Sequence, residues 1–120
     1  MRIFKFGGAS VKDADGIKNV YDVLQKVGYE DVILVVSAMG KTTNALEVVI
    51  KNYFDKSAEL TSSVQEIKKY HNQILLDLFE DEKHAVFAAV TAQFSELEYF
   101  LAHNKSPNYN FVYDQIVSYG

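Results

Sequence analysis

The sequence contains no cysteine and no tryptophan, and only one of its 120 residues is proline. Without cysteine the chain can form no disulfide, no thiol nucleophile and no thiolate-bound metal centre. The three histidines, His71, His84 and His103, lie outside any metal-ligand spacing, so we expect solvated residues on helix surfaces. The N-terminus lacks the apolar core of a signal peptide, and no apolar run is long enough to span a bilayer. These absences predict a cytoplasmic protein without a membrane partner.

Basic residues are also in short supply, with 12 Lys and Arg against 16 Asp and Glu and a formal net charge of -4. They are scattered, and Lys68 and Lys69 form the only adjacent pair. Because nucleic-acid binding normally requires a basic face or arm, we expect no nucleic-acid partner. The chain does contain 48% apolar residues, including eight Tyr and eight Phe, which is enough for a folded core.

The first half of the chain alternates strand and helix patterns. Residues 2–6 and 31–36 are rich in branched and aromatic side chains, and the continuous apolar run of the second segment suits a strand buried on both faces. Helical spacing predicts a helix that Gly28 closes and a second helix that begins near Thr43 and Asn44. The sequence therefore predicts an α/β fold with a β-α-β-α start. Each strand ends in a loop, which is where open α/β sheets bind ligands.

The second half contains helical patterns only. Apolar residues recur at helical spacing in residues 58–80, 82–102 and 110–119. We expect the two longer helices to pack as a helical hairpin. Because only two strands are evident, both edges of the predicted sheet are open, and such sheets normally contain more strands. The sequence therefore predicts a fragment that self-associates, as a homo-oligomer for example, or that is only marginally stable.

The first candidate site extends from Lys5 to Ser10. A strand, the glycine pair Gly7 and Gly8, and a helix start together present backbone N–H groups to an anion. Ser10 can add a hydroxyl donor, and Lys5, near the carboxyl end of the strand, can reach a phosphate as a point charge. A plain β-α turn followed by a helix and preceded by an exposed lysine explains the same pattern equally well.

The second candidate site is the turn after the second strand, which reads SAMGKTTN over residues 37–44. It imitates the end of a P-loop, but the glycine required five positions before Gly40 is Val35 here, so the P-loop interpretation fails. The turn still offers side-chain donors to an oxyanion, and two of them suit a helix N-cap equally well. The donors are Ser37, Thr42, Thr43 and Asn44, and the possible caps are Thr43 and Asn44. Two such loops predict a domain that binds a nucleotide or another phosphate.

Three segments carry a family resemblance: KFGGASV at residues 5–11, VVSAMGKTTN at 35–44 and DQIVSYG at 114–120. In order and spacing they resemble the aspartokinases of the amino-acid kinase superfamily. The resemblance implies a partial three-layer αβα fold, with residues 1–120 as the N-terminal part of a catalytic domain. Ala9 stands where the family usually has threonine. The resemblance also implies that the family glutamate after Gly120, the later active-site residues and the regulatory ACT domains lie outside this chain.

The resemblance further implies ATP-dependent phosphorylation of the β-carboxylate of L-aspartate, the first step towards lysine, threonine and methionine. ATP and Mg²⁺ would be the cofactors, and Lys5 would be catalytic by neutralising charge on the transferring phosphoryl group. Lys5, Gly7, Gly8, Ala9, Ser10 and Ser37 would bind ATP, and Ser37, Thr43 and Asn44 would bind aspartate. We expect the chain to be inactive alone. One alternative is a non-catalytic module of the same fold that keeps its phosphate loops for binding or assembly. Another is a different small-acid kinase of the same fold.

Overall fold

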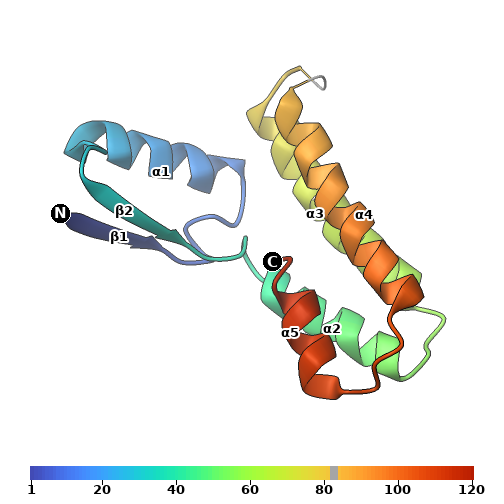
Figure 1. The fold of residues 1–120 in the computed structure, drawn as a ribbon. Coiled ribbons are helices and arrows are strands. Elements are labelled where there is room, and N and C mark those ends of the chain that lie inside the picture. Colours follow the sequence, from blue (N-terminus) through green and yellow to red (C-terminus); the bar gives the residue numbers. More distant parts are fainter. Residues whose placement is uncertain (82–83) are drawn as a thin grey trace. The chain divides into compact units, whose positions relative to one another are not determined.

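A computed structural model of the chain describes residues 1–81 and 84–120, which divide into two compact units, Met1–Thr42 and Thr43–Gly120 (Figure 1). In the described residues there are five helices and one parallel sheet of two strands. The predicted mixed α/β class is therefore confirmed.

The first unit is a β-α-β element made of β1 (Arg2–Phe6), α1 (Ala14–Val27) and β2 (Val32–Val36) (Figure 1). The two strands are parallel neighbours, with Lys5 opposite Val35 in the register. Since parallel strands need a crossover connection, the helix between them follows directly from this pairing. Both predicted strands are present, the second one residue shorter than expected.

Local signals in the sequence set both ends of α1. The Asp13 carboxylate accepts a hydrogen bond from the Gly16 amide at 2.8 Å and caps the first turn. At the other end, Gly28 has a φ of 80°, a left-handed conformation that glycine adopts without steric strain. The predicted closure of this helix at Gly28 is confirmed.

The expectation that the second strand is buried on both faces is wrong. Ile33, Leu34, Val35 and Val36 keep 44% to 56% of their surface exposed. A parallel sheet becomes buried only when helices cover both of its faces, and the first unit contains a single helix. β2 therefore has the composition of a buried strand in an exposed setting.

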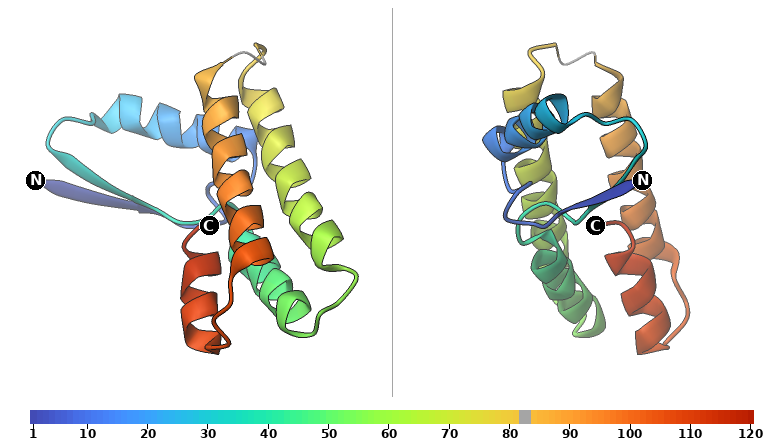
Figure 2. Two further views of the ribbon diagram at one scale, coloured as in Figure 1. Left: turned by 45° about the vertical axis from the view of Figure 1, so that its right-hand side comes forward. Right: turned by 90° about the vertical axis from the view of Figure 1, so that its left-hand side faces the viewer.

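The second unit is helical. It contains nearly all of α2 (Thr42–Phe54), together with α3 (Leu60–Leu78), α4 (Ala85–His103) and α5 (Tyr109–Val117). Figures 1 and 2 show α3 and α4 side by side as the predicted helical hairpin. The ends differ from the predicted ranges by one or two residues at α3 and α5. The predicted start of the fourth helix at residue 82 lies outside the described residues.

One apolar core joins the four helices of the second unit. Its members are at most 5% exposed and come from every helix: Leu46, Val49, Ile50, Val64, Ile67, Leu97, Val112 and Ile116. Burying one such side chain contributes roughly 1.5–3 kcal/mol. A polar link supports this core, because the Asn104 side-chain amide after α4 donates to the Tyr53 hydroxyl of α2 at 2.9 Å.

Candidate functional site

The two loops that the sequence singles out follow β1 and β2 in the first unit. Because the strands are parallel neighbours, their carboxyl ends meet at the same edge of the sheet (Figure 1). The Ser37 amide donates to the Phe6 carbonyl at 3.0 Å, so the pairing continues one residue beyond β2. This places the start of the second loop beside the end of the first strand.

The first loop forms a tight turn ahead of α1. The Ser10 amide donates to the Gly7 carbonyl at 3.0 Å, and the Val11 amide donates to the Gly8 carbonyl at 3.2 Å. Val11 is buried and fixes the end of the turn, whereas Gly7, Ala9 and Ser10 are exposed. The exposed part of the turn is therefore the glycine-rich part that the sequence predicts to meet an anion.

The second loop is closed by Thr42. Its amide and its hydroxyl both donate to the Met39 carbonyl, at 3.0 Å and 2.6 Å, and its surface is only 4% exposed. The expectation that Thr42 offers a donor to an oxyanion is therefore wrong, since its hydroxyl is used inside the turn. The Ser37 hydroxyl donates to the Ala38 carbonyl at 2.8 Å, but Ser37 is exposed and its hydroxyl can rotate to another partner.

The two loops contact each other directly. The Gly40 amide donates to the Gly8 carbonyl at 3.1 Å. A Cβ atom added at Gly8 would lie 2.5 Å from the Gly40 carbonyl oxygen and 3.3 Å from that of Ala38. Gly40 adopts a φ of 54°, which suits glycine. Gly40 lies inside the predicted second loop, but the sequence suggested no role for it there; the available signal was a glycine in a short turn between a strand and a helix.

The edge formed by the two loops carries unused donors. Within the described residues, the amides of Gly8 and Ala9 donate no hydrogen bond to another protein group. Lys5 is exposed one residue before the end of β1 and forms no salt bridge with a described residue. Free amides, an exposed ammonium group and the nearby start of α1 make this edge suited to an anionic group.

Thr43 and Asn44 belong to the second unit, where both are exposed on the first turn of α2. The suggestion that one of them is the N-cap of this helix is wrong, because the helix already begins at Thr42. Their side chains are accessible to a ligand. The structure thus brings together Lys5, both glycines of the first loop and Ser37 in the first unit. Thr43 and Asn44 lie in the second unit.

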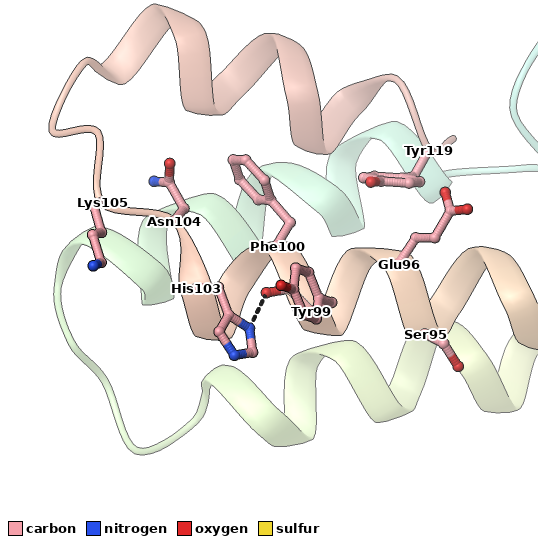
Figure 3. Close-up of a pocket in the computed structure, with 8 residues that line it drawn as sticks. All are labelled: Ser95, Glu96, Tyr99, Phe100, His103, Asn104, Lys105 and Tyr119. Atoms are coloured by element: carbon pink, nitrogen blue, oxygen red, sulfur yellow. Dashed lines mark hydrogen bonds between the residues drawn. The ribbon is translucent and has the colours of Figure 1, made fainter.

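A pocket of about 690 Å³ lies elsewhere, in the second unit (Figure 3). Tyr99 and His103 stack at its side with ring centroids 4.1 Å apart, and Figure 3 shows the hydrogen bond between His103 Nδ1 and the Tyr99 carbonyl oxygen. The lining residues are Ser95, Glu96, Tyr99, Phe100, His103, Asn104, Lys105 and Tyr119. None of the residues predicted from the sequence to form a site lines this pocket.

The histidines serve structural roles in the helices. His71 is half-buried, with its ring edge-on to Phe94 at 5.7 Å, so the expectation of a solvated surface residue is wrong for it. The other two are exposed, and the His84 ring accepts a hydrogen bond from the Val86 amide at the start of α4. In residues 1–81 and 84–120 no group of three or more His, Cys, Asp or Glu is placed to hold a metal ion. No helix in the same ranges is both long and apolar enough to cross a membrane.

The amino acid kinase family matches residues 1–108, which include both loops and most of the helical unit. The chain belongs to the amino acid kinase family.

Among curated proteins the chain is similar to aspartokinases. It is 34% identical over 79 residues to aspartokinase 1, chloroplastic, of Arabidopsis thaliana, a match that covers 63% of this chain and 14% of that protein. Aspartokinase 2, chloroplastic, of the same plant is 46% identical over 44 residues, or 37% of this chain and 8% of that protein. The bifunctional aspartokinase/homoserine dehydrogenase 1, chloroplastic, of Arabidopsis thaliana is 29% identical over 87 residues, which covers 72% of this chain and 10% of that protein. The matches thus span 8% to 14% of these relatives' own length.

Proposed function

We propose that this chain carries the phosphate-binding loops of an aspartokinase, which transfers the γ-phosphoryl group of ATP to the β-carboxylate of L-aspartate. The observation that carries the proposal is the hydrogen bond from Gly40 to Gly8, which joins two loops at one sheet edge beside the exposed Lys5. Membership of the amino acid kinase family supports the kinase chemistry. The names of the similar proteins, which are aspartokinases, support aspartate as the acceptor. A setting in lysine, threonine and methionine biosynthesis is part of the proposal.

In this proposal the first loop receives the phosphates of ATP. The free amides of Gly8 and Ala9 and the exposed Ser10 hydroxyl donate to phosphate oxygens, and Gly7 lets the nucleotide approach the backbone closely. The Lys5 ammonium group adds a positive charge on the same edge. The backbone amides of the turn can replace the hydroxyl that is lost where Ala9 stands.

In this proposal, residues that follow β2 bind the acceptor. Ser37, at the start of the second loop, contacts both substrates, and the exposed Thr43 and Asn44 bind aspartate. A carboxylate oxygen of aspartate forms a new bond to the γ-phosphorus. The bond from that phosphorus to the oxygen bridging the β- and γ-phosphates breaks, and ADP leaves with the bonding electron pair.

The reaction needs charge stabilisation more than proton transfer. An aspartate side chain has a pKa of about 3.9, so the nucleophile is ionised at neutral pH and no general base is required. Two anions must instead be brought together, and charge builds up on the transferring group. A lysine and a set of backbone amides suit that task, which gives Lys5 its catalytic role.

Magnesium ions accompany ATP in kinases and are held by phosphate oxygens, water and carboxylates. The described residues contain no cluster of acidic side chains that fits such an ion. We therefore assign no protein ligand to Mg²⁺ and derive no step through it.

The prediction of a cytoplasmic location stays a prediction.

A second function is favoured by the extent of the matches, which reach 8% to 14% of the relatives' length. Most residues of those proteins have no counterpart in this chain. A non-catalytic module that binds ATP or another phosphate through the same loops would need only the edge described above.

Calorimetric titration of the chain with Mg-ATP, combined with an ADP-release assay in the presence of aspartate, tests both functions. Binding without turnover supports the phosphate-binding role and assigns catalysis to residues outside this chain. ADP release that depends on aspartate, and not on glutamate, supports a complete aspartokinase site. Absence of Mg-ATP binding overturns the proposal.

A further inference from the structure

Gly8 approaches the second loop more closely than any residue with a side chain can. The Cβ that an alanine would place there lies 2.5 Å from the Gly40 carbonyl oxygen, a distance that real Cβ atoms essentially never show. The obstacle is backbone, which cannot rotate away as a flexible side chain would. At Gly7, by contrast, an added Cβ meets nothing within 4 Å. The two neighbouring glycines therefore have different reasons to be glycine.

The Gly8 carbonyl is the point at which both loops are joined. It accepts one hydrogen bond from Val11, which shapes the first loop, and one from Gly40, which holds the second. Gly40 reaches it through a left-handed backbone with a φ of 54°. A change in the position of Gly8 therefore moves both loops.

The second loop is also fixed from its own side. Thr42 is buried and binds the Met39 carbonyl twice, so the turn that presents Gly40 is closed by internal bonds. All of these bonds join groups of the two loops themselves. The protein's own contacts therefore set the spacing of the loops.

We propose that Gly8 and Gly40 are positioning residues that hold the two loops at a fixed spacing and so preassemble the phosphate site. This inference rests on the proposed function for the identity of the ligand. The contact between Gly8 and Gly40 does not depend on that function. A preassembled set of amides needs no ordering when the nucleotide binds, which favours affinity and correct placement of the reacting groups. In this assignment Gly7 allows the approach of the ligand, and Gly8 allows the approach of the second loop.

Hydrogen exchange tests the bond between the Gly40 amide and the Gly8 carbonyl. The exchange rate of the Gly40 amide is measured by NMR on the isotope-labelled full chain without nucleotide. We expect protection in the wild-type chain and exchange about tenfold faster in Gly8→Ala, the effect of losing one hydrogen bond. Gly7→Ala is the matched control for this readout, because the same added methyl group meets open space. Rapid exchange of Gly40 in the wild-type chain would overturn the inference and requires no variant to fold.

Titration with Mg-ATP separates positioning from mere stability. At a temperature where Gly8→Ala keeps the circular dichroism of the wild type, we expect its affinity to fall about tenfold, in parallel with the faster exchange. Unchanged affinity there would overturn the positioning role. In the wild type, Mg-ATP should alter the exchange of Gly40 little, and a large increase in protection would show that the loops assemble only with the ligand. A protected Gly40 in a chain that does not bind Mg-ATP would contradict the proposed function alone.

Discussion

Tyr113 of α5 donates its hydroxyl hydrogen to Oε1 of Glu47 on α2, with 3.0 Å between the two oxygens. This bond links two helices that also share the buried residues Val112 and Ile116 on one side and Leu46 and Val49 on the other. It raises the pKa of Tyr113, and the negative charge of Glu47 raises it further. The contact is exposed, so salt and solvent weaken it.

Because of this bond, the free energy of unfolding of the second unit should depend on pH in the alkaline range. Because the folded-state pKa of Tyr113 lies above its ordinary value of about 10, the stabilisation is complete below that value. It is lost as the pH rises through the raised pKa. We expect Tyr113→Phe to lower the free energy of unfolding at neutral pH and to reduce its decline in alkali, measured by urea denaturation.

Tyr21→Phe is the control for that measurement, since Tyr21 is 63% exposed on α1. It should behave as the wild type across the same pH range. An equal alkaline decline in Tyr113→Phe and in the wild type would show that the Glu47 contact does not contribute.

The charge of Lys5 should govern nucleotide affinity. In Lys5→Ala we expect Mg-ATP to bind about tenfold more weakly or worse, because a charge-assisted contact with phosphate contributes roughly 1.5–3 kcal/mol. The unfolding temperature should not change, since Lys5 is exposed and forms no salt bridge with a described residue. Calorimetry and thermal denaturation measure the two quantities.

Lys18→Ala removes the same charge from the exposed surface of α1 and should leave Mg-ATP affinity unchanged. If both lysine variants lose affinity equally, the effect is one of net charge, and Lys5 has no specific role at the phosphate site.

Thr42 should contribute to stability through its buried hydroxyl. Thr42→Val keeps the shape of the side chain but removes the 2.6 Å hydrogen bond to the Met39 carbonyl, which we expect to destabilise the fold by about 1 kcal/mol. Thr42→Ser keeps the hydroxyl and should lower the free energy of unfolding less than Thr42→Val does. Thr43→Val, at an exposed position on the same turn, should leave the free energy of unfolding nearly unchanged in urea denaturation. A stability of Thr42→Val equal to that of the wild type would contradict this assignment.

The exposed strand β2 should drive self-association. Ile33 and Val35 share one face of the sheet, and they are 47% and 45% exposed without a charged residue in the strand. An open edge with such a composition pairs readily with another chain. We expect sedimentation velocity to show concentration-dependent oligomers that Val35→Lys disperses.

Val48→Lys makes the same substitution at a valine that is 51% exposed on α2, and it should leave the oligomers intact. A monodisperse wild-type monomer at high concentration, or equal dispersal by both variants, would show that β2 is not the interface.

The order and type of the elements could be predicted because they depend on residues close together in the sequence. The apolar run of residues 32–36, the helical spacing of residues 60–78 and the Gly28 end of α1 are visible in single segments. Such patterns reflect backbone preferences and nearby hydrogen bonds. The same signals placed both candidate loops at the carboxyl ends of strands.

The roles of individual residues within those loops required the tertiary structure. Thr42 looks like a free donor in the sequence, but it is buried and bonded to Met39. Thr43 and Asn44 look like caps, but the helix begins before them. In each case a shift of one residue along the turn decides which hydroxyl is exposed, and periodicity does not resolve such a shift.

The sequence by itself determined an α/β chain with two glycine-containing loops, a lysine at the first of them and the family resemblance that these segments carry. Only the tertiary structure decided that Gly8 and Gly40 touch, that β2 is exposed, and that His71 packs against Phe94. The physical reason is distance along the chain. Local structure follows from neighbouring residues, whereas close approach and burial depend on segments that meet only after folding.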